Sequence, residues 1–211
     1  MPADKHFFDT VRSLFGGRLS QGQVDGMNNM VKYGEKWEYS PVWLAYILAT
    51  AMHETAEWMQ PIREGARRYG PSYSDAQAKR AVASIHAKGI ISTNYALPAG
   101  PHRQSYYGRG LVQLTWYDNY LKFERLLKIP LTENPDKALE WDVALDIMFM
   151  GMRDGMFRKD ESLDTIEGPD DYVNARGIVN GDGHKKWGGD KRIDERLADN
   201  AKVFLEALKG V

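Results

Sequence analysis

The chain has 211 residues, a length that corresponds to one sizeable domain or two small lobes. Its 28 basic and 29 acidic residues give a formal net charge of −1, which does not favour nucleic-acid binding, and 43% hydrophobic residues argues against disorder. The absence of cysteine excludes thiol catalysis, zinc fingers and disulfides, and is typical of a protein folded in a reducing cytoplasm.

Residues 1–17 lack the apolar core of a secretion signal, and the longest apolar stretch, residues 42–52, is too short to cross a bilayer. We therefore expect a protein that is made in the cytoplasm without a signal peptide and does not insert into a membrane. No repeat or low-complexity linker divides the sequence, so we predict a single domain over residues 1–211, and we expect a monomer.

Helix signals dominate the first half of the chain. A capping box that starts at Ser20 predicts a helix ending near Trp37. Ser40 and Pro41 form the next start signal, for a helix to about Met59 that is apolar almost all round and is therefore expected to be a buried central element. Ser74 predicts a third helix, which would stop at Lys88–Gly89.

The second half is more irregular. Residues 91–110 are rich in Pro, Gly, Ser and Tyr and predict a long loop with a short hairpin. Three further helices are predicted: one opened by a cap at 115–118 and ending before Pro130, one from 134 to about 154, and one from 191 to 208 after a glycine-rich loop at 180–189. The predicted fold class is mainly α with a small sheet.

Several catalytic motifs fail on inspection. His53-Glu54-Thr55-Ala56-Glu57 begins like a zinc-protease helix, but the second histidine is missing because position 57 is glutamate. The other histidines show no helical ligand spacing, and the sequence has neither a phosphate-binding loop nor a serine nucleophile elbow. We expect no metal and no organic cofactor.

Carboxylates remain as the candidate catalytic groups. Glu54 lies near the end of the apolar helix, where partial desolvation favours the protonated form that a general acid needs. Glu57 is one turn away, and Glu64 follows a break at Pro61 in a loop that could face back toward Glu54. A buried acid opposed by a more exposed base is the arrangement of glycoside hydrolysis. For any one glutamate, an ion pair at a helix end is the commoner explanation.

The segment from Tyr106 to Tyr120 crowds aromatic and amide side chains around a glycine turn, a composition that suits a saccharide cleft. A tight turn into a capped helix, with Thr115 as the N-cap only, is the alternative. Residues 61–110 also carry eight basic residues against two acidic ones. These charges are either solvated helix faces or the lining of a groove for an anionic polymer such as peptidoglycan.

Three blocks of the sequence resemble, in the same order, signature blocks of the family 19 glycoside hydrolases, which include plant-type chitinases and phage endolysins of the lysozyme-like superfamily. The blocks are Ala51–Thr55, Tyr107–Tyr120 and Ile178–Gly181. Residues 7–12 and 60–64 resemble the compact phage and prophage members, so the resemblance covers most of the chain. It implies an α+β lysozyme-like fold with two helical lobes and a cleft.

The resemblance also implies an inverting mechanism and assigns roles. Glu54 matches the general acid, Glu64 matches the general base of the compact members, and Thr115 stands where the family holds the attacking water. The implied substrate-binding residues are Tyr107, Gln113, Asn119, Asn180 and Arg196, with Arg192 as an alternative to Arg196.

Departures from the family pattern point to the substrate. The Glu54–Glu64 interval is short; with the longer interval of plant chitinases, Asp75 would be the base. Asp118 stands where chitinases usually carry an aromatic residue, and the cysteines of secreted plant enzymes are missing. We therefore expect an endolysin that hydrolyses β-1,4 bonds of peptidoglycan after its release from the cytoplasm. A chitinase, or a silent glycan-binding virion protein, is the alternative.

Overall fold

The computed structural model describes residues 3–158, 161–186 and 190–209, and it divides the chain into two compact units. Unit 1 consists of Met1–His53 and Met148–Val211, and unit 2 is the intervening segment Glu54–Ile147. The chain is mainly helical with one small sheet, which confirms the predicted fold class. The prediction of a single domain over residues 1–211 stays a prediction.

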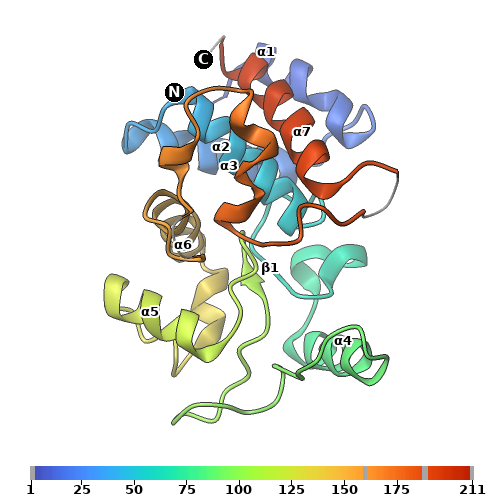
Figure 1. Cartoon of the computed structure of the whole chain (residues 1–211), viewed down its shortest axis with the longest axis vertical. Helices are drawn as coiled ribbons and strands as arrows, with labels where there is room; N and C mark the ends of the chain where they lie inside the picture. The colour runs from blue at the N-terminus through green and yellow to red at the C-terminus, as the bar shows by residue number, and fades with distance from the viewer. Residues whose placement is uncertain (1–2, 159–160, 187–189, 210–211) are drawn as a thin grey trace. The chain divides into compact units, whose positions relative to one another are not determined.

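Unit 1 contains both ends of the chain and most of the long helices (Figure 1). Its helices are α1 (Lys5–Val11), α2 (Gln21–Lys36), α3 (Pro41–Glu54, of which the final residue is counted in unit 2) and α7 (Ile193–Leu208). Helices α1 and α7 pack against each other through Phe7 and Phe204, whose ring centroids are 6.4 Å apart. Every residue of α3 from Leu44 to Met52 is buried, which confirms the prediction of a buried central helix.

Two helices begin where the capping signals predicted. Ser20 opens α2 and Ser74 opens α4 (Asp75–Ala87) in unit 2, each by a capping box with the glutamine three residues later. In both cases the serine oxygen accepts a hydrogen bond from the backbone of that glutamine, while the glutamine side chain accepts one from the serine backbone. These local bonds satisfy donors that the first helical turn leaves unpaired, so the sequence alone locates the start.

Two predicted helix boundaries are wrong. Helix α3 ends at Glu54 and not near Met59, because Ala56, Glu57 and Met59 adopt left-handed backbone conformations that no α-helix contains. The predicted helix from 134 to 154 is split into a 3-10 helix, Pro135–Leu139, and α6 (Trp141–Arg153), since Glu140 between them is extended.

The other late elements follow the prediction more closely. Helix α5 (Tyr117–Leu127) ends before Pro130, as expected, but its N-cap is Trp116, so Thr115 is not the cap. Helix α7 begins at Ile193, two residues after the predicted start. Residues 187–189 of the predicted glycine-rich loop lie outside the described residues.

Unit 2 is built around a two-stranded antiparallel sheet of β1 (Ile62–Arg63) and β2 (Arg109–Gly110). The loop-rich segment therefore supplies one strand, whose partner precedes α4 in the chain. A single antiparallel bridge between Ala99 and Gln104 is the local hairpin inside this segment. Figure 1 shows α4 and α5 on opposite sides of the loop.

The described residues contain no helix that is both long and apolar enough to span a bilayer. Within the same residues, no group of three or more His, Asp or Glu side chains is arranged to hold a metal ion.

Candidate active site

Glu64 is fixed at the end of the small sheet. It directly follows β1, and its backbone N–H donates to the carbonyl oxygen of Gly108 at 2.8 Å, which continues the strand pairing by one residue. The Gly108 N–H in turn donates to Glu64 Oε2 at 2.9 Å. Backbone and side chain of Glu64 are thus both tied to the same glycine, so the sheet register decides where this carboxylate lies.

Gly108 lets the backbone approach Glu64 closely. A Cβ added at Gly108 would lie 2.9 Å from Gln113 Oε1 and 3.2 Å from Glu64 Oε2, closer than ordinary van der Waals contact. With a side chain here, the ends of the Gln113 and Glu64 side chains would have to shift slightly. The glycine of the Tyr-Gly-Arg-Gly segment therefore serves close approach of the backbone to Glu64.

The second oxygen of Glu64 is held by Tyr95. The Tyr95 hydroxyl donates to Glu64 Oε1 at 2.6 Å. Burial raises the pKa of Glu64 above its usual value, and the bonds from Tyr95 and Gly108 together with the charge of Arg109 oppose that rise only in part. Burial and the charge of Glu64 also raise the pKa of Tyr95, so the phenol keeps its proton and remains the donor. A carboxylate with a raised pKa is suited to accept a proton near neutral pH.

Thr115, Gln113 and Asn119 form a chain of hydrogen bonds that leads to β1. Asn119 Nδ2 donates to the carbonyl oxygen of Thr115 at 2.8 Å, and the Thr115 hydroxyl donates to that of Gln113 at 2.8 Å. Gln113 Nε2 then donates to the carbonyl oxygen of Ile62, the residue that pairs with Gly110, at 3.1 Å. The structure thus brings three of the predicted polar residues together, next to β1, the strand that Glu64 directly follows.

The backbone is strained in two segments of unit 2, residues 56–59 and residues 113–116. Left-handed conformations occur at Gln113 and Trp116, and at Ala56, Glu57 and Met59 directly after Glu54. For residues other than glycine such conformations cost on the order of 1 kcal/mol or more, and they concentrate at functional sites. Five of the eight described non-glycine residues with positive φ lie in these two segments, and the other three are Glu38, Arg103 and Lys128.

Glu54 is the last residue of α3 and the first of unit 2, and it is half-buried, whereas Glu57 is exposed. Thr55 holds the turn that follows: it is buried, its Oγ1 accepts from the Met59 N–H at 3.0 Å, and its carbonyl oxygen accepts from Trp58 at 3.1 Å. These bonds replace the helical ones that the left-handed residues remove. Helix α3 therefore ends at Glu54 in a turn that Thr55 holds.

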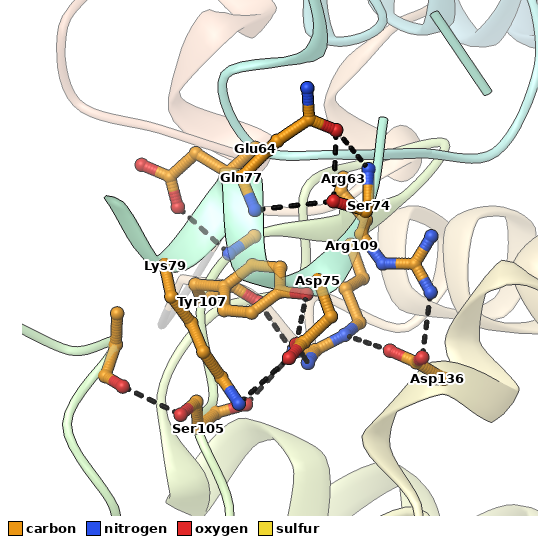
Figure 2. Close-up of polar contacts among 12 residues, drawn as sticks. Arg63, Glu64, Ser74, Asp75, Gln77, Lys79, Ser105, Tyr107, Arg109 and Asp136 are labelled. Atoms are coloured by element: carbon orange, nitrogen blue, oxygen red, sulfur yellow. Dashed lines mark hydrogen bonds and ion pairs between the residues drawn. The ribbon is translucent and has the colours of Figure 1, made fainter. Parts of the chain in front are cut away.

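Asp75 belongs to a different cluster, shown in Figure 2. It accepts hydrogen bonds from the Tyr107 hydroxyl and from Lys79, both at 2.8 Å, and lies 3.6 Å from Arg109 Nη2. Burial acts to raise the pKa of Asp75, but these bonds and the charges of Lys79 and Arg109 outweigh it and lower the pKa. A carboxylate held by so many donors is a poor proton acceptor, so the geometry favours Glu64 over Asp75 as the candidate base.

Arg109 is the centre of that cluster. Its side chain is 3% exposed, and it donates to Asp136 at 2.8 Å, to the carbonyl oxygens of Ser105 and Tyr107, and to the Tyr120 hydroxyl. Asp136 also accepts from Arg63 at 2.6 Å, which links the cluster to β1 (Figure 2). The network links both strands of the sheet, because Arg63 of β1 and Arg109 of β2 share Asp136, and it thereby supports Glu64.

Tyr107 is fully buried, and its ring lies 3.7 Å from the Arg109 guanidinium carbon. Its hydroxyl is directed at Asp75 and its carbonyl oxygen accepts from Arg109 and Tyr120. These contacts give Tyr107 a structural role, and direct substrate contact by this side chain stays a prediction that its burial does not favour.

Asn180 and Arg196 belong to unit 1 and are described there by themselves. The Asn180 N–H donates to the carbonyl oxygen of Arg176 at 3.0 Å, and Arg176 Nε donates to Asp182 at 2.7 Å. Arg196 Nη2 lies 3.4 Å from Nδ1 of His53, the residue that precedes Glu54 in the chain.

Arg192 is paired with Asp194 at the start of α7. Of the two arginines, Arg196 is the one that contacts His53, and its role in substrate binding stays a prediction. The sequence analysis did not select the Arg176–Asp182 ion pair. Neither residue belongs to a motif, and only folding of the segment between them brings the two charges together.

Tyr95 and Trp116 complete the surroundings of Glu64. Their rings meet edge to face with centroids 5.0 Å apart, and Trp116 is 47% exposed. The sequence analysis did not select Tyr95, which lies outside the motif blocks in the loop-rich segment. Only its packing shows that it contacts Glu64.

Comparison with known proteins identifies solved structures with a similar fold. No protein-family model matches the chain, and no curated protein matches it. Among solved structures, it is similar to chitinase C from Streptomyces griseus HUT6037, with a TM-score of 0.52 and 18% identity over 98% of this chain and 78% of the other. A bacterial family 19 chitinase matches with a TM-score of 0.47 and 23% identity over 98% and 94% of the two chains. The first likeness shows that this chain has the fold of chitinase C.

Proposed function

We propose that the protein is a glycoside hydrolase that cleaves β-1,4 bonds of peptidoglycan by an inverting acid–base mechanism. The observation that carries this proposal is Glu64, a half-buried carboxylate with one donor on each oxygen, in a chain whose fold is that of a chitinase. The motif blocks around Glu54 and Thr115, and the backbone strain beside both, support the same interpretation.

In the proposed reaction, Glu54 donates its proton to the glycosidic oxygen as the bond from that oxygen to the anomeric carbon breaks. A water molecule attacks the anomeric carbon from the opposite face, and Glu64 takes the proton that this water loses. Thr115 contributes to holding the water. The raised pKa of Glu64 suits this role because a base works best when its pKa lies near the pH at which it operates.

Charge supports peptidoglycan as the substrate. Five basic residues of the segment 61–110 remain exposed to solvent, whereas the other three pair with Asp75 or Asp136. The exposed ones are Arg67, Arg68, Arg80, Lys88 and Arg103. An excess of exposed positive charge favours an anionic polymer, and peptidoglycan is anionic whereas chitin is neutral.

Chitin is the second candidate, because chitinase C has the same fold. The two polymers share β-1,4 linkages between N-acetylated sugars, so the same acid–base pair serves either one. A phage or prophage endolysin, made without a signal peptide and released at lysis, is the biological role that we propose for the peptidoglycan enzyme.

The test is the release of reducing ends from purified peptidoglycan and from colloidal chitin, with Glu54→Gln as the matched control. We expect release from peptidoglycan that the variant lacks, and proton NMR of the first products should show inversion at the anomeric carbon. Release from chitin alone would move the substrate assignment to chitin. Binding to either glycan without release would contradict the enzyme assignment and indicate a silent glycan-binding protein.

A further inference from the structure

The Tyr95 hydroxyl and the Gly108 N–H hold the two oxygens of Glu64 from different segments of unit 2. We propose that Tyr95 is a positioning residue, which fixes the orientation of the Glu64 carboxylate and favours its ionised form. This inference rests on the proposed function, since it assigns to Tyr95 a part in the reaction at Glu64.

The first step of the argument is geometric. An ionised carboxylate has about four acceptor sites, two on each oxygen. One donor on Oε1 at 2.6 Å and another on Oε2 at 2.9 Å prevent the carboxylate from rotating, yet leave a second site on each oxygen for a water molecule. Loss of the Tyr95 hydroxyl would leave Gly108 as the single fixed donor and allow the carboxylate to turn.

The second step concerns how Tyr95 itself is held. Its ring packs against the buried cluster of Ala78, Val82, Ala96 and Tyr107, and its edge meets the Trp116 ring at 65°. The left-handed backbone at Trp116 places that ring, and the Trp116 N–H donates to Tyr106 at 2.8 Å. The phenol is therefore oriented by packing, so its hydrogen bond to Glu64 is preformed.

The third step is electrostatic. The titratable groups that face Glu64 are Arg109, Tyr95 and Tyr120. Burial raises the pKa of Tyr120 to about 12, so it is neutral, whereas the Arg109 charge and the Tyr95 bond both favour ionised Glu64. Without the Tyr95 hydroxyl, burial of Glu64 is opposed less, its pKa rises further, and the base is protonated over a wider range of pH.

The test compares Tyr95→Phe with Tyr73→Phe. Tyr73 packs against the same cluster, but its hydroxyl donates to the carbonyl oxygen of Gln77 at 3.3 Å and not to Glu64. Two readouts are taken for each: the pH profile of kcat/KM, and titration of the Glu64 carboxyl by carbon NMR, assigned with Glu64→Gln.

For Tyr95→Phe we expect the acidic limb of the profile to move to higher pH, with kcat/KM about tenfold lower at pH 5 and about threefold lower or less at pH 8. The NMR pKa of Glu64 should rise in the same variant, and Tyr73→Phe should change neither readout.

An unchanged Glu64 titration in Tyr95→Phe would overturn the assignment, as would an equal change in Tyr73→Phe. If the wild-type protein hydrolyses neither glycan but the Glu64 titration still responds to Tyr95→Phe alone, the proposed function fails and the positioning of Glu64 by Tyr95 stands.

Discussion

Glu64 and Asp75 are two partly buried carboxylates of unit 2. The charge of Arg109 lowers the pKa of both, yet the net pKa shifts of the two groups have opposite directions. Glu64 has two neutral donors, Tyr95 and Gly108, and burial leaves its pKa raised. Asp75 bonds directly to a cation, lies near a second, and has a lowered pKa. The comparison shows what the partners decide. A direct cationic partner lowers the pKa of Asp75, so this carboxylate is a poor proton acceptor. Neutral donors orient Glu64 but leave its pKa raised, so it can accept a proton.

The largest expected effect separates the two carboxylates by activity. Glu64→Gln should lower kcat/KM by about a thousandfold or more, because the attacking water loses its proton acceptor. Asp75→Asn should keep at least about a third of the activity, since Asp75 contacts structural partners only. Rates of reducing-end release by both purified variants check this. A reversed ranking would assign the base to Asp75.

The next effect concerns stability. Arg109→Met removes the buried guanidinium and leaves the carbonyl oxygen of Ser105 without this donor. Asp136 and the carbonyl oxygen of Tyr107 each lose one of two donors. We expect a loss of about 1–3 kcal/mol in the free energy of unfolding, the usual cost of leaving a buried polar group without its partner. Urea unfolding followed by circular dichroism measures it, with the exposed Arg103→Met as the matched control. Equal losses in the two variants would argue against the network.

A smaller effect is expected from Gly108→Ala. The added methyl group would lie too close to Gln113 Oε1 and Glu64 Oε2, so both side-chain ends have to shift slightly. We expect kcat/KM to fall about ten- to a hundredfold, as for other small displacements of a catalytic group. The control is Gly168→Ala, where no atom lies within 4 Å of the added carbon and φ is not positive, as at Gly108. Full activity of Gly108→Ala would show that the close approach is not required.

The smallest expected effects are on the free energy of unfolding, to which Asp75 and Glu64 contribute with opposite dependence on pH. Asp75 has a lowered pKa in the folded protein, so its contribution is present above the unfolded pKa of about 3.9 and is lost as the pH falls through the folded value. Asp75→Asn should therefore cost about 0.5–1 kcal/mol at pH 7, a value reduced for solvent screening, and almost nothing near pH 2.

Glu64 has a raised pKa, so the sign is reversed. Its contribution is present below the unfolded pKa of about 4.3 and is lost as the pH rises through the folded value. The free energy of unfolding of wild type minus that of Glu64→Gln should accordingly increase as the pH is lowered from 7 to 4. Urea unfolding at several pH values tests both variants, and slopes of the same sign would contradict the contrast.

Local chemistry explains which parts of the fold could be predicted. The Ser20 and Ser74 capping boxes are contained in four consecutive residues each, and both located their helix. The end of α3 was missed because Thr55 and its buried turn stop the helix, and no glycine or proline announces that stop. The pairing of β1 with β2 was missed because its two strands are separated by α4 and a long loop.

By itself, the sequence determined the mainly helical class and the buried character of α3, and it singled out Glu54, Glu64 and Thr115 as candidates whose roles stay predictions. These follow from composition, from hydrophobic pattern and from motifs short enough to lie within one segment. Only the tertiary structure decided that Tyr95 and Gly108 hold Glu64 while Lys79 and Tyr107 hold Asp75. The reason is physical: the proton affinity of a carboxylate depends on burial and on the donors within about 3 Å, and folding brings most of those from distant parts of the chain.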